Sequence, residues 1–464
     1  MRVARRQFLR SGMALAAAAP AYGALAGCST SEMNSARRNL ATDPKGLLDL
    51  PPGFTYQRFS ETGETMSDGL IVPARHDGMG VFAVEGEPDL CVLVRNHELD
   101  ASHFSDGPFG QSARKPSGYS TDKIYDISPN GQPLPGGTTS LVYNVRTAQL
   151  EQSYLSLAGT DRNCSGGITP WGSWLSCEES RTLAGGNVSK DHGYTFEVPS
   201  ATRGLATPIA LKEMGRFNHE AVAIDPRTGI VYQTEDEKDG LIYRFLPNEP
   251  GALAKGGKLQ ALVILDQPGA DTRNWSGAPT FAVGGRFKTG WIDLDHVESP
   301  DGDLRLRGFA KGAALFARGE GMAWAVEPGG GSVYFACTTG GPADSGQIWR
   351  YAPSAYEGST REIEAPGELV LHYESPAKSE MDMCDNIVAA PWGHLVACED
   401  GHGENFVHGI APDGRVYPIA RNAKNHSEFA GACFSSDGQV LFVNMQNPGI
   451  TLAIRGPWAN IALA

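Results

Sequence analysis

Short runs of β-branched, aromatic and aliphatic residues recur along most of the chain, each bounded by turn residues, and long amphipathic helix patterns are missing. Five such runs are residues 90–95 (LCVLVR), 230–234 (IVYQT), 241–245 (LIYRF), 332–336 (SVYFA) and 440–444 (VLFVN). Runs of this length and composition are typical of β-strands. The pattern therefore predicts an all-β protein with short helical insertions.

Several of these strands follow the same turn, in which an acid or a proline and then a glycine precede the apolar run. The turns are residues 225–229 (DPRTG), 327–331 (EPGGG), 413–414 (DG) and 437–438 (DG). A turn and a strand repeated along one chain are typical of the blades of a β-propeller. We therefore predict a propeller.

The first 27 residues have the pattern of an export signal. The twin arginine Arg5-Arg6 precedes an alanine-rich apolar run, and residues 25–28 (LAGC) resemble a lipobox in which Cys28 is acylated. The apolar run is too short to remain as a membrane helix. We predict a twin-arginine/lipoprotein signal peptide at residues 1–27, a tether at 28–44 and one folded domain at 45–464. The alternative is a cytosolic protein with a frayed apolar tail.

These predictions place the protein in the periplasm or on the cell surface, with membrane contact only through the lipid. Lys and Arg total 39 against 53 Asp and Glu, a net charge of −14. Removing residues 1–27 takes away four arginines and no acid, so the charge becomes −18. Such a chain is poorly suited to contact nucleic-acid phosphates, and we exclude that partner. The 464 residues, 41% of them hydrophobic, can bury a large core, and 57 Gly and 30 Pro indicate many turns.

The eight cysteines form no C-x-x-C pair, which excludes zinc-ribbon and thioredoxin-like sites. If Cys28 carries lipid, seven remain, so at least one thiol is unpaired within the chain. The chain also lacks a nucleophile elbow, a phosphate loop, an H-E-x-x-H motif and a complete EF-hand loop. An active site built from one contiguous motif is therefore not expected.

A ten-residue segment occurs twice without a gap, at residues 170–179 (PWGSWLSCEE) and 391–400 (PWGHLVACED), with five identical positions. Asn-His-Glu also occurs twice, at residues 96–98 and 218–220. Repeats that place acids and amides at strand ends predict that several blades send polar side chains to one axial site. The alternative is that the repeats are signatures of blade packing alone.

The candidate ligands form a dispersed set of carboxylates and amides beside strands or turns. They are Glu98, Glu178, Glu179, Glu220, Glu235, Asp236, Glu320, Asp385, Asn386, Glu399, Asp400 and Glu428. Oxygen-rich sets of this size suit hard cations such as Ca²⁺ or Fe³⁺. Cys164, in a glycine-containing turn, adds a softer ligand that would favour a transition metal; the alternative is a buried inert thiol.

Arg318 is the candidate anion-binding residue, because its planar guanidinium matches the oxygens of a phosphate. It lies two residues before Glu320, so we expect both side chains on the same face of a strand. Metal ions next to an arginine would neutralise charge during phosphoryl transfer. The alternative is a purely structural Arg–Glu ion pair.

The sequence resembles the PhoX-type alkaline phosphatases in seven segments between residues 95 and 449. These segments are residues 95–98 (RNHE), 163–179 (NCSGGITPWGSWLSCEE), 214–225 (MGRFNHEAVAID), 232–236 (YQTED), 316–324 (FARGEGMAW), 384–401 (CDNIVAAPWGHLVACEDG) and 428–449 (EFAGACFSSDGQVLFVNMQNPG). The resemblance implies an exported six-bladed β-propeller that hydrolyses phosphomonoesters with Fe(III) and Ca²⁺. We expect the two ends of the chain to pair and close the ring.

The resemblance also implies roles for individual residues. Cys164 corresponds to an iron-ligating thiolate, and Glu179, Glu220 and Glu320 correspond to carboxylates around the metal cluster. Arg318 corresponds to the residue that holds the phosphoryl group, so Arg318 and Glu320 are the expected catalytic pair. The expected calcium-binding acids are Asp236, Asp385 and Asp400. The expected substrates are small phosphate esters, and the expected state is a monomer.

Two other functions are compatible with a propeller. One is a calcium-dependent lactonase or esterase, which would need calcium alone and no thiolate ligand. The other is a non-enzymatic, lipid-anchored propeller that binds a partner or a glycan. The bound metals distinguish the three, since iron with calcium favours the phosphatase, calcium alone the lactonase, and no stoichiometric metal the binding module.

Overall fold

The computed structural model describes residues 40–112, 119–275 and 281–463. The predicted signal peptide, Cys28 and most of the tether lie outside the described residues. The described part contains two α-helices, α2 (Leu304–Ala310) and α3 (Trp458–Leu463), and many strands. The predictions of a mostly β protein and of short helical insertions are therefore confirmed.

No helix within the described ranges combines the length and the apolar character needed to cross a membrane.

The strands form antiparallel sheets, three of which contain three or four strands. The first consists of β3 (His76–Val84), β4 (Glu87–His97), β5 (Gly136–Asn144) and β6 (Gln149–Thr160). The second consists of β7 (Asn163–Ile168), β8 (Ser173–Glu178) and β9 (Thr195–Pro199). The third has the order β2 (Thr55–Glu61), β25 (Ile450–Arg455), β24 (Val440–Met445) and β23 (Phe429–Phe434).

The other two sheets are larger. One contains β19 (Cys384–Ala389), β20 (Leu395–Glu399), β21 (Phe406–Ile410), β22 (Val416–Asn422) and the short β1 (Leu48–Asp49). The other has nine strands in the order β10 (His219–Ile224), β11 (Val231–Glu235), β12 (Ile242–Pro247), β13 (Gly257–Ile264), β14 (Arg286–Asp293), β18 (Gly367–Glu374), β17 (Gln347–Ala352), β16 (Ser332–Cys337) and β15 (Gly319–Ala325). Its strands β14 and β18 join two groups of strands along their outer edges.

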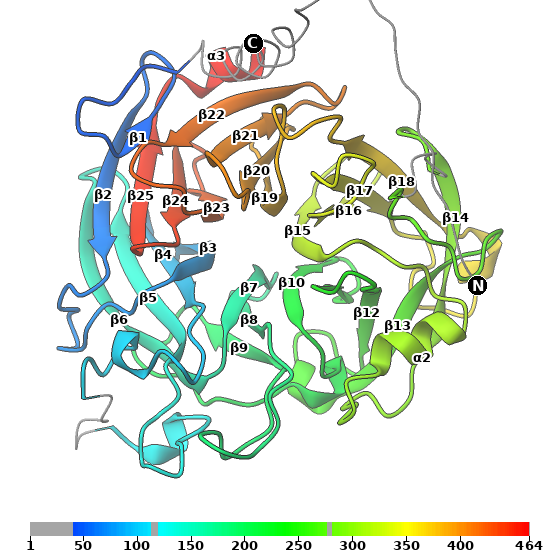
Figure 1. The fold of residues 1–464 in the computed structure, drawn as a ribbon, viewed down its shortest axis with the longest axis horizontal. Coiled ribbons are helices and arrows are strands. Elements are labelled where there is room, and N and C mark those ends of the chain that lie inside the picture. Colours follow the sequence, from blue (N-terminus) through cyan, green and yellow to red (C-terminus); the bar gives the residue numbers. More distant parts are fainter. Residues whose placement is uncertain (1–39, 113–118, 276–280, 464) are drawn as a thin grey trace, which may run out of the picture.

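The sheets are arranged around one axis, as in a propeller (Figure 1). The strands nearest the axis contact one another in a closed cycle, in the order β3, β7, β10, β15, β19, β23 and back to β3. The ring is closed by β2, from the beginning of the described chain, which pairs with β25 from its end. The predicted pairing of the two chain ends is confirmed.

The repeated turns occupy the predicted places. Residues 225–229 join β10 to β11, where the backbone N–H of Gly229 donates to the carbonyl of Asp225 at 2.8 Å. The duplicated ten-residue segments form equivalent hairpins, from β7 into β8 and from β19 into β20. The repeat in the sequence is therefore a repeat of one structural unit.

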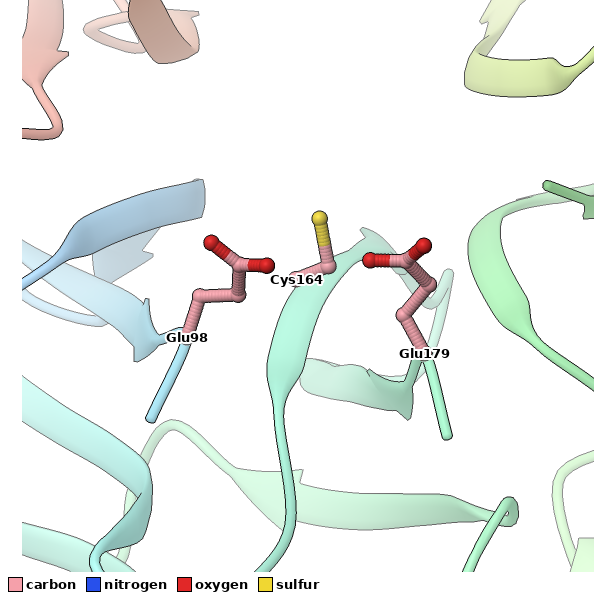
Figure 2. A group of neighbouring side chains, drawn as sticks. All are labelled: Glu98, Cys164 and Glu179. Carbon is pink, nitrogen blue, oxygen red and sulfur yellow. The ribbon is translucent and has the colours of Figure 1, made fainter. Parts of the chain in front are cut away.

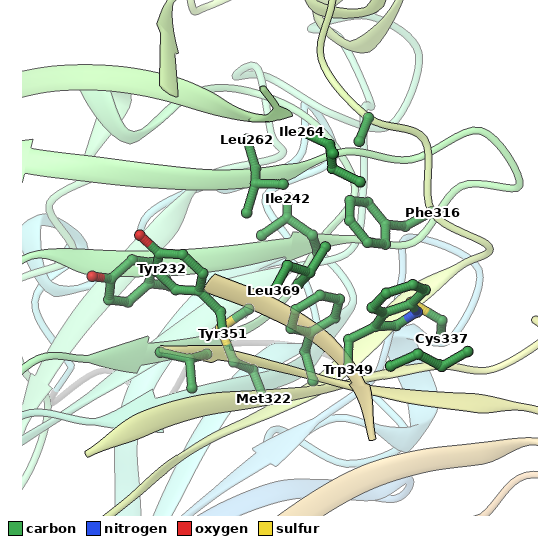
Figure 3. Packing of buried hydrophobic residues seen from close by; sticks show 14 of the residues in the cluster. Tyr232, Ile242, Leu262, Ile264, Phe316, Met322, Cys337, Trp349, Tyr351 and Leu369 are labelled. Atoms are coloured by element: carbon green, nitrogen blue, oxygen red, sulfur yellow. The ribbon is translucent and has the colours of Figure 1, made fainter. Parts of the chain in front are cut away.

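Apolar side chains fill the spaces between neighbouring sheets. In one such cluster, residues from β10 to β13 pack against residues from β15 to β18 and from the segment just before β15. Among them are Tyr232, Phe316, Trp349 and Leu369 (Figure 3). Trp349 and Phe316 are completely buried. All seven described cysteines are buried free thiols, so disulfides contribute nothing to this part of the fold.

A buried arginine links the first sheet to the closing strands. Arg95 of β4 donates from Nη1 to Ser60 Oγ of β2 at 3.0 Å and to Thr451 Oγ1 of β25 at 2.6 Å. Its Nη2 donates to Thr139 Oγ1 of β5 at 3.0 Å. Burial lowers the pKa of Arg95 to about 9, so at neutral pH the guanidinium keeps its charge and all its donors.

We expect Arg95→Ala to lower the free energy of unfolding by about 2 to 4 kcal/mol, because it leaves buried hydroxyls without a donor and creates a cavity. Arg58→Ala is the control. Arg58 lies on β2, one of the strands that Arg95 contacts, but its side chain is 53% exposed and pairs with Glu61 at the surface. It should cost less than about 0.5 kcal/mol. Chemical denaturation measures both, and equal effects would show that Arg95 does not hold the closure.

Candidate metal centre

The six strands nearest the axis share a β-bulge close to the start of each strand. In β7, Asn163 pairs with Glu178 and Gly166 with Ser176, so two residues of β7 oppose one residue of β8. The same irregularity occurs in β3, β10, β15 and β19, and one residue later in β23. A bulge changes the direction of a side chain. In five of the strands the first residue of the bulge carries a carboxylate or a thiol: Asp77, Cys164, Glu220, Glu320 and Asp385.

A backbone hydrogen bond that recurs at all six inner strands defines two further positions around the bulge. We call the residue just before each inner strand the lead position, and the residue just after the next strand of the same sheet the second-strand position. The backbone N–H at the second-strand position donates to the backbone carbonyl at the lead position, at 2.9 to 3.3 Å. The lead positions are Arg75, Arg162, Asn218, Arg318, Met383 and Glu428. The second-strand positions, in the same order, are Glu98, Glu179, Asp236, Thr338, Asp400 and Gln446.

One cavity of about 230 Å³ lies where these positions meet. Every residue that lines it comes from a lead, bulge or second-strand position: Arg75, Asp77, Glu98, Arg162, Cys164, Glu179, Asp236, Arg318, Glu320, Asp385, Asp400, Glu428 and Gln446. Residues hundreds of positions apart in the sequence thus meet because the ring is closed. We call this space the axial cavity.

Three groups of side chains around the axial cavity have the spacing of metal ligands. They are Glu98 with Cys164 and Glu179 (Figure 2), Asp77 with Glu98 and Glu428, and Glu220 with Glu320 and Asp385. Within each group the ligand atoms lie within 4.8 Å of one another. Ligands bound at about 2.0 to 2.5 Å from one ion lie at most about 5 Å apart, so each group can hold a cation.

Glu220 gives the clearest indication of a missing partner. Its side chain is completely buried, and among the described residues neither of its carboxylate oxygens has a hydrogen-bond partner. Buried carboxylates are normally paired or hydrogen-bonded. The residues of this group therefore fit a bound cation.

The charges around the axial cavity do not balance. With Glu220, nine carboxylates face three guanidiniums, which leaves a formal excess of six negative charges. Burial, followed by repulsion from Glu320 and Asp385, raises the pKa of Glu220 well above its usual range. Burial also raises the pKa of Asp385 to about 7 and that of the Cys164 thiol well above its ordinary value. Bound cations would offset these costs.

Two of the cavity arginines each contact two carboxylates. Arg318 donates from Nε and Nη2 to Asp236 at 2.8 and 2.9 Å, and from Nη2 to Glu320 at 2.5 Å. Arg162 donates from Nε to Glu98 at 2.9 Å, and its Nη2 lies 3.1 Å from Glu179. The carboxylate of Glu320 raises the pKa of Arg318, so this guanidinium keeps its charge.

The expectation that Arg318 and Glu320 share one face of a regular strand is wrong. Arg318 precedes β15 with a φ of +55°, and Glu320 lies in the bulge. The left-handed backbone and the bulge, and not strand alternation, bring the two side chains together. Their ion pair was the structural alternative for Arg318, and it is present.

Most residues predicted for the site surround the axial cavity. Cys164, Glu179, Asp236, Arg318, Glu320, Asp385 and Asp400 line it, and Glu220 contacts this set from β10. Sequence reasoning assigned no role to Asp77, Arg75, Arg162 and Gln446, and no specific role to Glu98 and Glu428. One signal could have found three of them: Arg75-x-Asp77, Arg162-x-Cys164 and Arg318-x-Glu320 repeat an arginine two residues before a bulge ligand.

Three acids of the dispersed set lie outside the cavity lining and stabilise their own sheets. Glu178 accepts from the backbone N–H of Gly193, and Glu399 from that of Phe406. Glu235 accepts from Tyr243 Oη at 2.7 Å. Each precedes a cavity acid in the sequence, so the first acid of each pair packs the sheet and the second faces the axis.

The fold and this site define a propeller-like protein with an acidic axial centre whose side chains have the spacing of metal ligands. Comparison with known families is consistent with that class: the family model described as "Alkaline phosphatase PhoX" matches residues 36–449. The chain belongs to the PhoX alkaline phosphatase family. It is therefore a hydrolase of phosphomonoesters, and membership implies dependence on metal ions. This decides against the lactonase and the non-enzymatic binding module.

One solved structure supports the fold. Pseudomonas fluorescens PhoX in complex with vanadate, a transition state analogue, is 17% identical with a TM-score of 0.64, covering 90% of this chain and 97% of that chain. A gluconolactonase from Xanthomonas campestris is 13% identical with a TM-score of 0.40, covering 88% of this chain and 98% of that chain, a similarity too low to carry an argument. No curated protein matches the chain.

We expect Glu220→Gln to have opposite effects on stability with and without metal. In chelated protein it should raise the melting temperature by a few degrees, because it removes the cost of burying an ionisable carboxyl against Glu320 and Asp385. In metal-loaded protein it should lower the melting temperature, because a ligand is lost. Thermal unfolding with and without chelator measures both, and a change of the same sign in both states would contradict a cation at Glu220.

Proposed function

We propose that this protein hydrolyses phosphomonoesters outside the cytoplasm with a cluster of iron and calcium ions held in the axial cavity. The observation that carries the proposal is the mixture of donors. Cys164 lies between Glu98 and Glu179, whereas the other two ligand groups offer only oxygen. A thiolate favours a transition metal such as Fe(III), and all-oxygen groups favour Ca²⁺.

We also propose that the ring has six blades. Six inner strands repeat the same lead, bulge and second-strand positions, and each is followed by its own antiparallel strands. The nine-stranded sheet then contains two blades joined through β14 and β18.

Arg318 is the residue proposed to bind the phosphoryl group. Two of its nitrogens are held by Asp236 and Glu320, which fixes the plane of the guanidinium. Among the described residues its Nη1 has no hydrogen-bond partner, so one amino group is available to a phosphoryl oxygen. Bound metal ions would supply Lewis acidity and neutralise the charge of the ester. The vanadate bound by Pseudomonas fluorescens PhoX supports an oxyanion at this site.

Glu320 has two roles in this proposal. It belongs to a ligand group with Glu220 and Asp385, and it holds Nη2 of Arg318. A change at Glu320 would therefore disturb both cation binding and the orientation of the guanidinium.

We also propose that the protein is exported through the twin-arginine pathway and that Cys28 carries a lipid. This pathway carries folded proteins, so the metal cluster could assemble before the protein crosses the membrane. The excess of buried carboxylates supports early loading, because cations would offset their repulsion during folding.

We expect Arg318→Ala to lower turnover of p-nitrophenyl phosphate by about 10²-fold or more and to leave bound metal unchanged, because Arg318 stabilises phosphoryl charge. Arg318→Lys keeps the charge without the planar fork and should recover only part of the rate. Turnover and metal content by mass spectrometry are measured on the same preparations. Near-normal turnover of Arg318→Ala would contradict its role.

We expect Cys164→Ala to lose iron and activity together, because a missing ligand opens the site itself. Cys177→Ala is the matched control: Cys177 is also a buried thiol of the same sheet, but it faces Thr195. It should keep both metal and activity. Purified wild-type protein that holds iron and calcium but hydrolyses no phosphomonoester would overturn the proposed function.

A further inference from the structure

Arg162 and Arg318 occupy equivalent places in the ring. Both lie at lead positions, and both have a φ of +55°, which an arginine rarely adopts. Arg162 donates its backbone N–H to Leu99, and Arg318 donates its own to Glu237. Each carbonyl accepts from the second-strand position. The two backbones therefore direct their side chains toward the axial cavity in the same way.

The two guanidiniums also use the same atoms. Each uses Nε and Nη2 to contact carboxylates of the cavity wall: Glu98 and Glu179 for Arg162, Asp236 and Glu320 for Arg318. In the part of the chain that the structure describes, Nη1 has no hydrogen-bond partner in either arginine. Arg162 thus has the property that makes Arg318 suitable for an anion.

The two arginines differ in how deeply their side chains are buried. The side chain of Arg162 is 44% exposed and that of Arg318 only 23%. Glu179 contacts Arg162, Asp236 contacts Arg318, and the charge of Asp236 raises the pKa of Glu179. An anion bound by Arg162 would therefore lie closer to solvent than the phosphoryl group bound by Arg318.

The third cavity arginine is less suited to this role. Arg75 is 34% exposed, and its Nη1 lies 3.6 Å from Glu98. Its Nη2 contacts His103 Nε2 at 3.3 Å, so both terminal nitrogens are directed at protein groups.

We propose that Arg162 is a specificity-determining residue that binds an anionic group on the alcohol part of the substrate. This inference rests on the proposed phosphatase function. The amino group of Arg162 without a protein partner offers a charge-assisted hydrogen bond to a carboxylate or second phosphate on the leaving group. The favoured substrates are then phosphomonoesters whose alcohol carries a further negative charge.

The test compares two substrates that differ at one carbon. In 3-phosphoglycerate that carbon is a carboxylate, and in glycerol 3-phosphate it is a hydroxymethyl group. We expect Arg162→Ala to lower the ratio of kcat/KM for 3-phosphoglycerate to that for glycerol 3-phosphate by about tenfold, mainly through KM, because one charge-assisted hydrogen bond is lost. Arg162→Lys should recover part of the ratio.

Metal content by mass spectrometry and a matched variant complete the experiment. Arg58→Ala removes an exposed arginine from β2, the strand of its sheet farthest from the axis, and should leave the ratio unchanged. An unchanged ratio in Arg162→Ala, or loss of its metal, would overturn the inference while wild-type activity upholds the proposed function. Metal-loaded wild-type protein inactive on both substrates would overturn both.

Discussion

Nine carboxylates share one space in this protein, and their mutual repulsion is the constraint on which the rest of the structure depends. Two unit charges about 5 Å apart repel each other by about 3 kcal/mol at an effective dielectric constant of about 20. Such a set persists only if the backbone holds it rigidly and if opposite charge enters the space. The closed ring of strands, with β2 paired to β25, provides the first condition. Three arginines provide part of the second, and the excess of acids accounts for dependence on cations.

The backbone places these acids with one feature that is repeated around the ring. A bulge near the start of each inner strand directs its first residue toward the axis in five strands, and the next strand ends with a residue directed at the same space. In the acid pairs Glu178-Glu179 and Glu399-Asp400, two neighbouring residues therefore have different roles. The first acid of each pair is bonded within its own sheet, and the second faces the cavity. The duplicated segment is therefore both a packing signature and part of the site.

Equivalent backbone positions hold different kinds of side chain. This difference makes a specific site from a repeating backbone. The bulge position holds a thiol in β7 and carboxylates in β3, β10, β15 and β19. The lead position holds arginine in three places, but Asn218, Met383 and Glu428 in the others. The soft ligand Cys164 and the more exposed arginine Arg162 thus lie two residues apart at the start of β7. The repeated backbone permits this because each sheet places its own side chain at the same position of the ring.

The sequence by itself determined the class of fold and the chemical composition of the site. Apolar runs between acid-glycine turns predicted the strands, and repeated segments predicted that several sheets contribute acids to one centre. Local patterns suffice for this, since strand propensity and turn chemistry act over a few residues. Cys164, Glu179, Glu320 and Asp385 were therefore among the candidates from these patterns, and the resemblance to the phosphatases implied their roles as metal ligands.

Strand and turn patterns left both acids of each neighbouring pair as candidates, and the tertiary structure shows directly which acid faces the cavity and which arginines join them. A bulge adds one residue to a strand and so reverses the alternation from which side-chain directions are predicted. Asp77, the first residue of the bulge in β3, was not a candidate, and neither was Arg162, which precedes β7. Glu235 was a candidate although its carboxylate bonds to Tyr243. The meeting of β3 with β23, more than 300 residues apart, follows from ring closure alone, and no local pattern encodes that contact.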